Sequence, residues 1–187
     1  GSSALSKDST IIVIDHSDAL VPLANMMGSL YIGDNPNSAV SANDLKILCQ
    51  GIYDINNSSD NTQSSLVKVN PYDVEVVWTQ PLNNIYNAQN LLSNNAGSWY
   101  FFTASDGVYS MNQDGTSVNQ LSPVIADVLF VQSEQYAPTD STTATTNMVY
   151  FNDAANNSNT IYKYNISLSS YVDTIVVNGN ILDINFY

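Results

Sequence analysis

Few side chains in this sequence could carry out acid–base or nucleophilic chemistry, and they lie far apart along the chain. The single histidine, His16, stands in "DHSD" after the apolar run "TIIVID". Carboxylates beside an imidazole suit metal binding or proton transfer, but no second histidine exists to complete such a site. A turn in which Ser17 or Asp18 caps a helix is the favoured interpretation. The single cysteine, Cys49, lies in the apolar run "LKILCQ" and is predicted to be a buried hydrophobe.

The sequence also lacks the patterns that build a nucleophile or a phosphate site. A Ser-His-Asp triad would have to use His16, and neither a Gly-x-Ser-x-Gly turn nor a glycine-rich phosphate loop occurs. With four lysines and no arginine, a phosphoryl-transfer site is not expected either. We therefore predict no catalytic residues and no enzyme activity.

A candidate calcium loop occurs in "DINNSSD", where oxygen-bearing side chains occupy alternate positions. These are Asp54, Asn56, Ser58 and Asp60. The spacing matches the first half of an EF-hand loop, but Ser59 stands where glycine is expected and Ser65 where a bidentate glutamate is needed. A loop without metal, and hence a protein without a cofactor, is the favoured interpretation. A weak calcium site at Asp54, Asn56 and Asp60 is the alternative.

Aromatic side chains are the other candidates for ligand binding. Trp99 and Tyr100 stand in "SWYFF", and Trp78 follows the run "VEVV". Because alternate residues of a strand share a face, Trp99 and Tyr100 are expected on opposite faces of one strand. Core packing accounts for at least one of these faces, and rings exposed on the other would stack on sugars or contact a protein. We predict that Trp78, Trp99 or Tyr100 contacts a ligand if its ring is exposed.

Charge narrows the class of ligand. The chain of 187 residues has 17 acidic and 4 basic side chains and a net charge of −13. Such a chain repels phosphate backbones and anionic lipid headgroups, which excludes nucleic acid and direct contact with an anionic membrane. Without arginine, bidentate capture of an anionic ligand is not available. The amide, hydroxyl and aromatic groups that remain suit a neutral polysaccharide or another protein.

The elements that would position these side chains are predicted to be short strands in repeats. Three strand pairs share a form: "GIYDIN" with "SLVKVN", "SWYFFT" with "GVYSMN", and "NMVYFN" with "TIYKYN". Their first strands begin at residues 51, 98 and 147, which gives a period of 47 and then 49 residues. A third apolar segment follows each pair, and a fourth precedes the next pair. Repeats of about 40 to 50 residues with four strands each are typical of propeller blades.

The stretch "GVYSMNQDGTSVNQLS", residues 107–122, is similar to a known family. With "SWYFFTASD" before it and "MVYFNDAANNSNTIYKYNIS" after it, it resembles the repeats of bacterial YWTD-like and TolB-like extracytoplasmic propellers. Those repeats have the form "LYRMNxDG" followed by "xxLT". Here Ser110 replaces the arginine, and the third copy lacks the Asp-Gly turn. The resemblance covers residues 51–187 and implies a fold, while it leaves the activity open.

We therefore expect an all-β fold of antiparallel four-strand repeats, a small or partial propeller, with one short N-terminal helix. The helix is predicted in "SDALVPLANMMGSL", where Ser17 is a candidate N-cap and Gly28 a stop. Residues 1–187 are expected to form a single domain, in which 1–8 are a tag or linker and 137–147 an exposed loop. The final "GNILDINFY" resembles the first strand of a further repeat.

These features predict a function only as a class. The leading hypothesis is a non-enzymatic binding or adhesion module of an exported or surface-anchored bacterial protein, extracellular or periplasmic, whose export signal lies outside this sequence. The first alternative is a carboxylate-dependent hydrolase acting on polysaccharide, since the many aspartates make carboxylate pairs easy to form. The second alternative is a structural or sensing extracytoplasmic domain that assembles with other chains.

Overall fold

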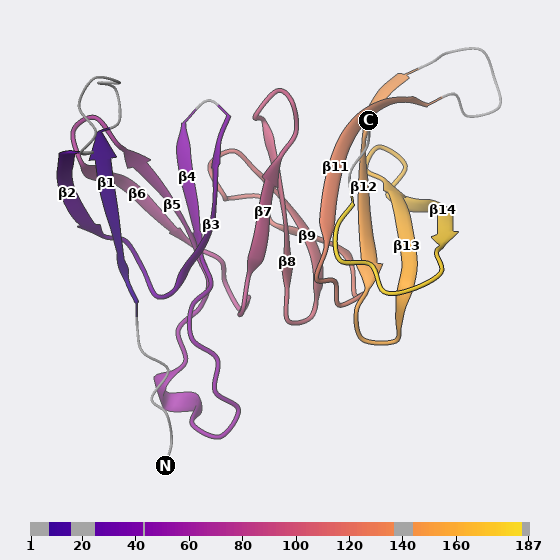
Figure 1. Ribbon diagram of the computed structural model, residues 1–187, viewed down its shortest axis with the longest axis horizontal. Helices are drawn as coiled ribbons and strands as arrows, with labels where there is room; N and C mark the ends of the chain where they lie inside the picture. The colour runs from indigo at the N-terminus through magenta and orange to yellow at the C-terminus, as the bar shows by residue number, and fades with distance from the viewer. Residues whose placement is uncertain (1–7, 16–24, 43, 137–143, 185–187) are drawn as a thin grey trace. The chain divides into compact units, whose positions relative to one another are not determined.

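Figure 1 shows a computed structural model of the protein. It describes residues 8–15, 25–42, 44–136 and 144–184. In these ranges the chain is all-β, and its only helical element is the 3-10 turn η1 (Ser58–Asp60). The chain divides into two compact units, residues 1–89 and residues 90–187.

The first unit contains a hairpin and a four-stranded sheet, all antiparallel. The hairpin pairs β1 (Thr10–Asp15) with β2 (Asn25–Tyr31). The sheet has the order β3-β4-β5-β6 and consists of β3 (Pro36–Ser41), β4 (Leu45–Cys49), β5 (Ser65–Asn70) and β6 (Glu75–Pro81). Consecutive strands are neighbours throughout, so the sheet is a simple meander.

The second unit contains two four-stranded antiparallel meanders (Figure 1). The first consists of β7 (Gln89–Ser93), which begins at the unit boundary, β8 (Trp99–Ala104), β9 (Gly107–Asn112) and β10 (Asn119–Ser122). The other consists of β11 (Leu129–Tyr136), β12 (Ala144–Asp153), β13 (Asn157–Asn165) and β14 (Ser170–Val176). No strand pairing joins one sheet to another among the described strands.

Aromatic and β-branched side chains join the two sheets of the second unit. A buried cluster lies between them, made of Phe101, Val108, Ala126, Val149, Phe151 and Tyr164. Apart from Ala126, which lies in the connection between β10 and β11, these side chains come from β8, β9, β12 and β13, as expected for the facing sides of two pleated sheets. The hydroxyls of Ser122 (β10) and Tyr171 (β14) lie 2.6 Å apart and add a hydrogen bond between the same sheets.

The last described residues cover the other face of the β11–β14 sheet. Ile181 and Ile184 are buried and pack with Met148 and Tyr150 of β12, which point away from the cluster between the sheets. Residues 179–184 form no strand, so the expected first strand of a further repeat is not seen in the described part of this segment.

Aliphatic side chains form the core of the first unit. Its buried cluster consists of Ile32, Ile47, Cys49, Val67 and Val69. Ile11 of β1 and Leu30 of β2 pack against this cluster, so the hairpin covers one face of the β3–β6 sheet. Cys49 is fully buried, as expected, and this burial raises the pKa of its thiol to about 11. A thiol that stays protonated at neutral pH is a poor nucleophile.

Two of the three predicted strand pairs are confirmed, and the first is wrong. "SWYFFT" and "GVYSMN" are β8 and β9, and "NMVYFN" and "TIYKYN" lie in β12 and β13. In the first repeat, however, β5 pairs with β4, and residues 51–56 lie in the long connection between them. Only Ile52 forms a bridge there, with Thr62. The apolar run "LKILC" buries four of its five side chains and outcompetes "GIYDIN" for the partner strand.

The predicted N-terminal helix is also wrong wherever the structure can test it. Met26, Met27 and Gly28, its last predicted turn, belong to β2. The apolar strand β1 needs a hydrogen-bonded neighbour, and pairing with β2 satisfies both backbones. Residues 17–24 of the predicted helix and His16 lie outside the described residues. The all-β class and the four-stranded antiparallel repeat are confirmed.

The expected exposed loop at 137–147 overlaps a strand, because β12 begins at Ala144. Residues 137–143 lie outside the described residues, as does most of the expected tag or linker at 1–8. In the described part of the chain, no helix is long and apolar enough to cross a lipid bilayer.

Candidate functional site

A tight turn between β5 and β6 presents one tyrosine to solvent. Its sequence is Asn-Pro-Tyr-Asp, residues 70–73, with proline at the second position, where its fixed φ favours a turn. The side-chain oxygen of Asn70 accepts hydrogen bonds from the backbone N–H groups of Tyr72 (3.1 Å) and Asp73 (3.4 Å). The amide nitrogen of Asn70 donates to the Asp73 carboxylate at 2.5 Å. The Tyr72 side chain is 87% exposed as a result.

The turn ends in a strained residue. Val74 has φ 52°, in the left-handed region that β-branched residues rarely occupy. Its side chain packs against Gly28 of β2, where an added Cβ would lie 2.9 Å from Val74 Cγ1. A conformation of this kind costs about 1–3 kcal/mol and is often found at functional sites. Gly28 therefore leaves room for the residue that fixes the exit of the turn.

Beside the turn, one carboxylate neutralises two lysines. Lys46 of β4 and Lys68 of β5 stand directly opposite each other in the register, an arrangement that is unfavourable for like charges. Asp44 Oδ2 accepts from Lys68 Nζ at 2.8 Å and lies 3.5 Å from Lys46 Nζ. The hydrogen bond from Lys68 is the main reason that the pKa of Asp44 is lowered. The carboxyl group is therefore ionised at neutral pH.

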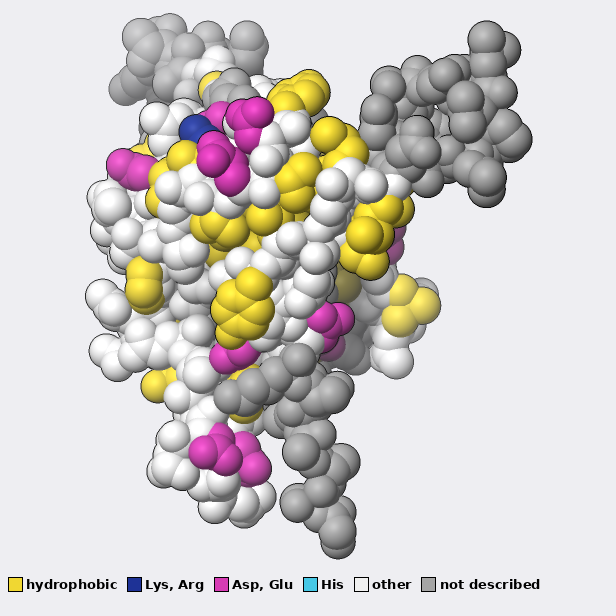
Figure 2. Space-filling model, turned by 90° about the vertical axis from the view of Figure 1, so that its left-hand side faces the viewer, with side chains coloured by type: hydrophobic (Ala, Val, Ile, Leu, Met, Phe, Trp, Pro, Cys, Tyr) yellow, Lys and Arg dark blue, Asp and Glu magenta, His cyan; other side chains and the backbone are white. Residues whose placement is uncertain are grey.

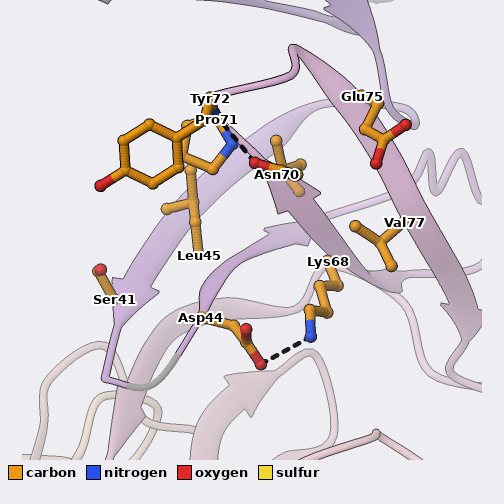
Figure 3. A pocket seen from close by; sticks show the side chains of 10 residues that line it. Ser41, Asp44, Leu45, Lys68, Asn70, Pro71, Tyr72, Glu75 and Val77 are labelled. Carbon is orange, nitrogen blue, oxygen red and sulfur yellow. Dashed lines mark hydrogen bonds and ion pairs between the residues drawn. The ribbon is translucent and has the colours of Figure 1, made fainter.

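The turn and the ion pair border an open hollow of about 560 Å³ at one end of the β3–β6 sheet. We call it the Tyr72 hollow. It is lined by Ser41, Asp44, Leu45, Lys68, Val69, Asn70, Pro71, Tyr72, Glu75 and Val77. In Figure 3, Tyr72 and Ser41 lie on one side, Glu75 and Val77 lie on the other, and the Asp44–Lys68 pair lies between them. All the lining residues belong to the first unit.

The lining combines an exposed ring with hydrogen-bonding groups of both kinds. Tyr72 offers a flat apolar face, and Leu45 and Val77 add aliphatic surface. Carboxylates accept hydrogen bonds, the Lys68 ammonium donates them, and the Ser41 hydroxyl does both. Such a combination suits a ligand with hydroxyl groups on a ring whose faces are apolar. A sugar fits this description.

The three aromatic residues predicted as ligand contacts lie elsewhere. Trp78 of β6 is half-buried and pairs with Lys68 in the register, but it does not line the Tyr72 hollow. Trp99 is half-buried and packs against the cluster between the sheets of the second unit. Tyr100 was predicted to contact a ligand only if its ring is exposed, and its ring is fully buried. Trp78 belongs to the first unit, and Trp99 and Tyr100 belong to β8 of the second.

The candidate calcium residues lie in the connection between β4 and β5. Asp54 Oδ1 accepts from the backbone N–H of Asn56 at 2.8 Å, and Asp60 Oδ2 accepts from the Asn57 amide at 2.8 Å. Both carboxylates are thus used in hydrogen bonds within the loop. No group of three or more His, Cys, Asp or Glu side chains able to ligate a metal occurs in the described residues.

A second lysine–carboxylate cluster lies in the second unit. Lys163 Nζ donates to Glu134 at 2.7 Å, the Tyr150 hydroxyl donates to the other Glu134 oxygen, and Lys163 lies 5.3 Å from the Tyr150 ring centre. Burial alone would raise the pKa of Glu134, but the hydrogen bonds from Lys163 and Tyr150 outweigh it and lower that pKa. Each group in this cluster is bonded to the other two. The arrangement is that of a structural ion pair.

Tyr72 was missed at the level of sequence, although a signal for it exists. Asparagine followed by proline marks a turn, and an aromatic residue in a turn between two strands has no sheet face to pack on. The aromatic residues predicted as ligand contacts, in contrast, all stand in expected strands. The Asp44–Lys68 pair had no comparable signal, because these residues are 24 positions apart and meet only through the pairing of β4 with β5.

No protein-family model matches this sequence, and no curated protein is significantly similar to it. The candidate site therefore rests on its own geometry. The resemblance to bacterial propeller repeats stays a prediction from short motifs.

Proposed function

We propose that this chain is a non-enzymatic binding module that holds a neutral glycan in the Tyr72 hollow. The observation that supports this most directly is the Tyr72 ring, 87% exposed at the rim of a hollow that also contains Asp44, Lys68 and Glu75. Leaving a large aromatic surface in water is unfavourable unless a ligand covers it. The neighbouring carboxylates and ammonium are placed to bond the hydroxyl groups of a sugar stacked on the ring.

The charge of the molecule supports a neutral ligand over an anionic one. The net charge is −13, and each lysine in the described residues already pairs with a carboxylate. An anionic ligand would meet long-range repulsion and would have to compete with Asp44 for Lys68. A neutral glycan meets neither obstacle.

The state of Asp44 argues against a hydrolase at this site. Glycosidases of the usual kind need a carboxylic acid that keeps its proton at neutral pH, which requires a raised pKa. The pKa of Asp44 is lowered by Lys68. A carboxylate held ionised by a lysine suits hydrogen-bond acceptance better than proton donation.

The proposal also covers the kind of protein to which this module belongs and where that protein is located. The four-stranded meanders are taken as blades of a propeller-like repeat, in a bacterial protein that is exported or attached to the cell surface. The asparagine-rich, lysine-poor composition and the short-motif resemblance support this context. A module in that position would attach the protein to polysaccharide outside the cell.

Binding to a panel of polymers tests the proposal. The probes are neutral α-glucan, β-glucan, mannan and galactan, with heparin and duplex DNA as anionic comparisons, each at low and high salt. We expect binding to at least one neutral glycan that changes little with salt, because no charge on the ligand is neutralised. Affinity electrophoresis and titration calorimetry measure this directly.

Matched tyrosine variants identify the site. Tyr72→Ala should weaken glycan binding at least about tenfold, equal to about 1.4 kcal/mol, whereas Tyr72→Phe keeps the ring and should retain most of the affinity. Tyr53→Ala is the control, because Tyr53 is 42% exposed but lies outside the hollow. Equal binding by the Tyr72→Ala and Tyr53→Ala variants would contradict the site. Salt-sensitive binding to heparin or DNA alone would contradict the proposed function.

A further inference from the structure

The hairpin β1–β2 is half the size of every other sheet in the described chain. The other three sheets have four strands each, whereas this one has two. It packs on the β3–β6 sheet through Ile11 and Leu30. A two-stranded ribbon is at best marginally stable unless further strands or packing support it. The missing half would have to come from outside the described strands.

Among the described strands, none pairs with the second edge of β1. The backbone N–H of Ile32 donates to Ser9 O at 2.9 Å, and the same register continues to Val13. Hydrogen-bonded and non-bonded pairs alternate along an antiparallel ladder, so the backbone groups of Thr10 and Ile12 point away from β2. The N–H of Thr10 confirms this direction, because it donates to the Asp8 side chain instead.

The space beside this edge is uncovered and apolar. Ala39 of β3 pairs with Ile47, and Ile47 with Val67, so Ala39 lies on the face of the sheet that carries the core. Yet Ala39 is exposed, because the hairpin does not extend over β3. A notch of about 200 Å³ marks the gap and is lined by Ile11, Pro36, Asn37, Ser38, Ala39 and Ile47.

The outer face of the hairpin points to an interface as well. Its exposed side chains are Ile12 (61%), Ile14 (55%), Met26 (68%) and Tyr31 (74%). Figure 2 looks onto the side of the molecule where β1, β2 and β6 lie in Figure 1, and hydrophobic side chains gather on it. By contrast, Ile181 and Ile184 cover the corresponding face of the β11–β14 sheet. Contiguous apolar surface of this kind marks a contact site.

We propose that β1 pairs with β1 of a second copy of this chain, giving one four-stranded antiparallel sheet in the order β2-β1-β1-β2. A two-fold axis perpendicular to β1 makes the two β1 strands antiparallel. With the axis near Ile12, the N–H of Ile12 donates to the C=O of the partner's Ile12, and the C=O of Ile12 accepts from the partner's N–H. The added strand then lies beside Ile11 over the notch and covers Ala39, which restores the four-strand count of the other sheets.

Charge predicts how this dimer responds to salt. The central residues of β1, Thr10 to Ile14, are uncharged, so the contact itself contains no like-charge pair. Two copies of net charge −13 nevertheless repel each other at long range. Salt screens this repulsion within about 10 Å at 0.1 M. Association should therefore strengthen as sodium chloride is added, the opposite of an interface built from ion pairs.

Sedimentation velocity over a range of concentrations tests the proposal on the full chain. We expect a monomer–dimer equilibrium between about 10 and about 500 µM, the range in which a weak edge contact is populated. The dimer fraction should rise with protein and with salt. Hydrogen exchange at the Ile12 amide should slow in the dimer, because this N–H gains a partner there.

Two variants and a control locate the contact. Ile12→Pro removes an N–H on the free edge, a position where proline is tolerated in edge strands, and should weaken association at least about tenfold. Ala39→Lys puts a charge into the notch from an exposed position and should have the same effect even if Ile12→Pro fails to fold. Val176→Lys is the control, since Val176 is 67% exposed at the end of the edge strand β14. A monomer at every concentration, or a dimer unaffected by Ala39→Lys, would overturn the proposal.

Discussion

In each unit a layer of strands packs on a four-stranded sheet, but this layer covers the sheet more completely in the second unit than in the first. In the second unit a four-stranded sheet packs on another, and the cluster between them contains the fully buried rings of Phe101 and Phe151. In the first unit a four-stranded sheet carries a two-stranded hairpin, and the core is aliphatic. The second unit is closed at this contact, whereas the first leaves Ala39 and the notch beside Ile47 open.

The lysine–carboxylate clusters of the two units also differ in how fully their carboxylates are bonded. In the second unit, Glu134 is bonded by both Lys163 and Tyr150 and is used for stability. In the first unit, Asp44 bonds Lys68 at the edge of an open hollow, next to an exposed ring. The carboxylate of the second unit is thus saturated by partners within the fold, whereas the Asp44–Lys68 pair of the first unit borders open space, as the proposed binding site requires.

The two tryptophans allow the units to be followed separately. Trp78 lies in the first unit and Trp99 in the second. Variants with a single tryptophan, made by Trp99→Phe or Trp78→Phe, therefore report the unfolding of one unit each by fluorescence. In these two backgrounds, urea unfolding can be measured for each unit separately.

The largest effect is expected from the core of the second unit. Phe101→Ala removes a fully buried ring and should destabilise that unit by about 3–5 kcal/mol. Ile47→Ala in the first unit should cost less, about 2 kcal/mol, because its side chain borders the open notch and the site can relax. Urea unfolding of the two backgrounds measures both values. Equal costs would show that the first core is as well packed as the second.

A smaller effect is expected at the tight connection of β8 and β9. Gly107 has φ 154°, and an added Cβ would lie 2.1 Å from the backbone oxygen of Ser122. Gly107→Ala should therefore destabilise the second unit by about 2–3 kcal/mol. Gly179→Ala is the matched control, since Gly179 also has positive φ but no atom lies within 4 Å of the added Cβ. Its cost should stay near 1 kcal/mol, and a cost equal to that of Gly107→Ala would contradict the clash.

Alkaline pH should destabilise the second unit more than the first. Burial raises the pKa values of Tyr109, Tyr150 and Tyr164 in the second unit. Burial alone would lower the pKa of Lys163, but its hydrogen bonds to Glu134 and Tyr150 outweigh this and raise it. Groups with raised pKa lose protons first in the unfolded chain, so their contribution is complete below about pH 10 and is lost above it.

The second unit should therefore lose stability as the pH rises above about 10, where the unfolded tyrosines begin to lose their protons. Urea midpoints in the Trp99 background measure this loss. A Cys49→Ala background removes the buried thiol of the first unit from the comparison. A larger loss of stability in the first unit than in the second under those conditions would contradict this prediction.

The smallest effect concerns calcium and the loop between β4 and β5. We expect millimolar calcium to leave the melting temperature unchanged, because Asp54 and Asp60 already accept hydrogen bonds within the loop. Differential scanning calorimetry in calcium and in chelator measures this. A rise in calcium that Asp54→Ala removes would establish the site that the sequence pattern suggested.

Much of the second unit could be predicted from sequence, and less of the first. "SWYFFTASDGVYSMN" contains two strand patterns separated by the two-residue turn Ser105-Asp106, so local pairing settled the register. In the first unit, 15 residues separate β4 from β5, and "GIYDIN" competed with "LKILC" for the same partner. The choice depended on which segment buried more apolar surface against β5. Such a sum over distant residues is not visible in a local pattern.

The sequence alone determined the all-β class, the antiparallel repeat of four strands and the burial of Cys49, and it predicts that polyanions are excluded as partners. These follow from local alternation, turn residues and net charge, which act without reference to the rest of the fold. Only the tertiary structure decided that Met26–Gly28 form a strand, that Tyr100 is buried, and that Asp44, Lys68 and Tyr72 border one hollow. Each of these depends on the register between strands far apart in the chain, because pairing free energy is summed over a whole ladder and cannot be read from either strand by itself.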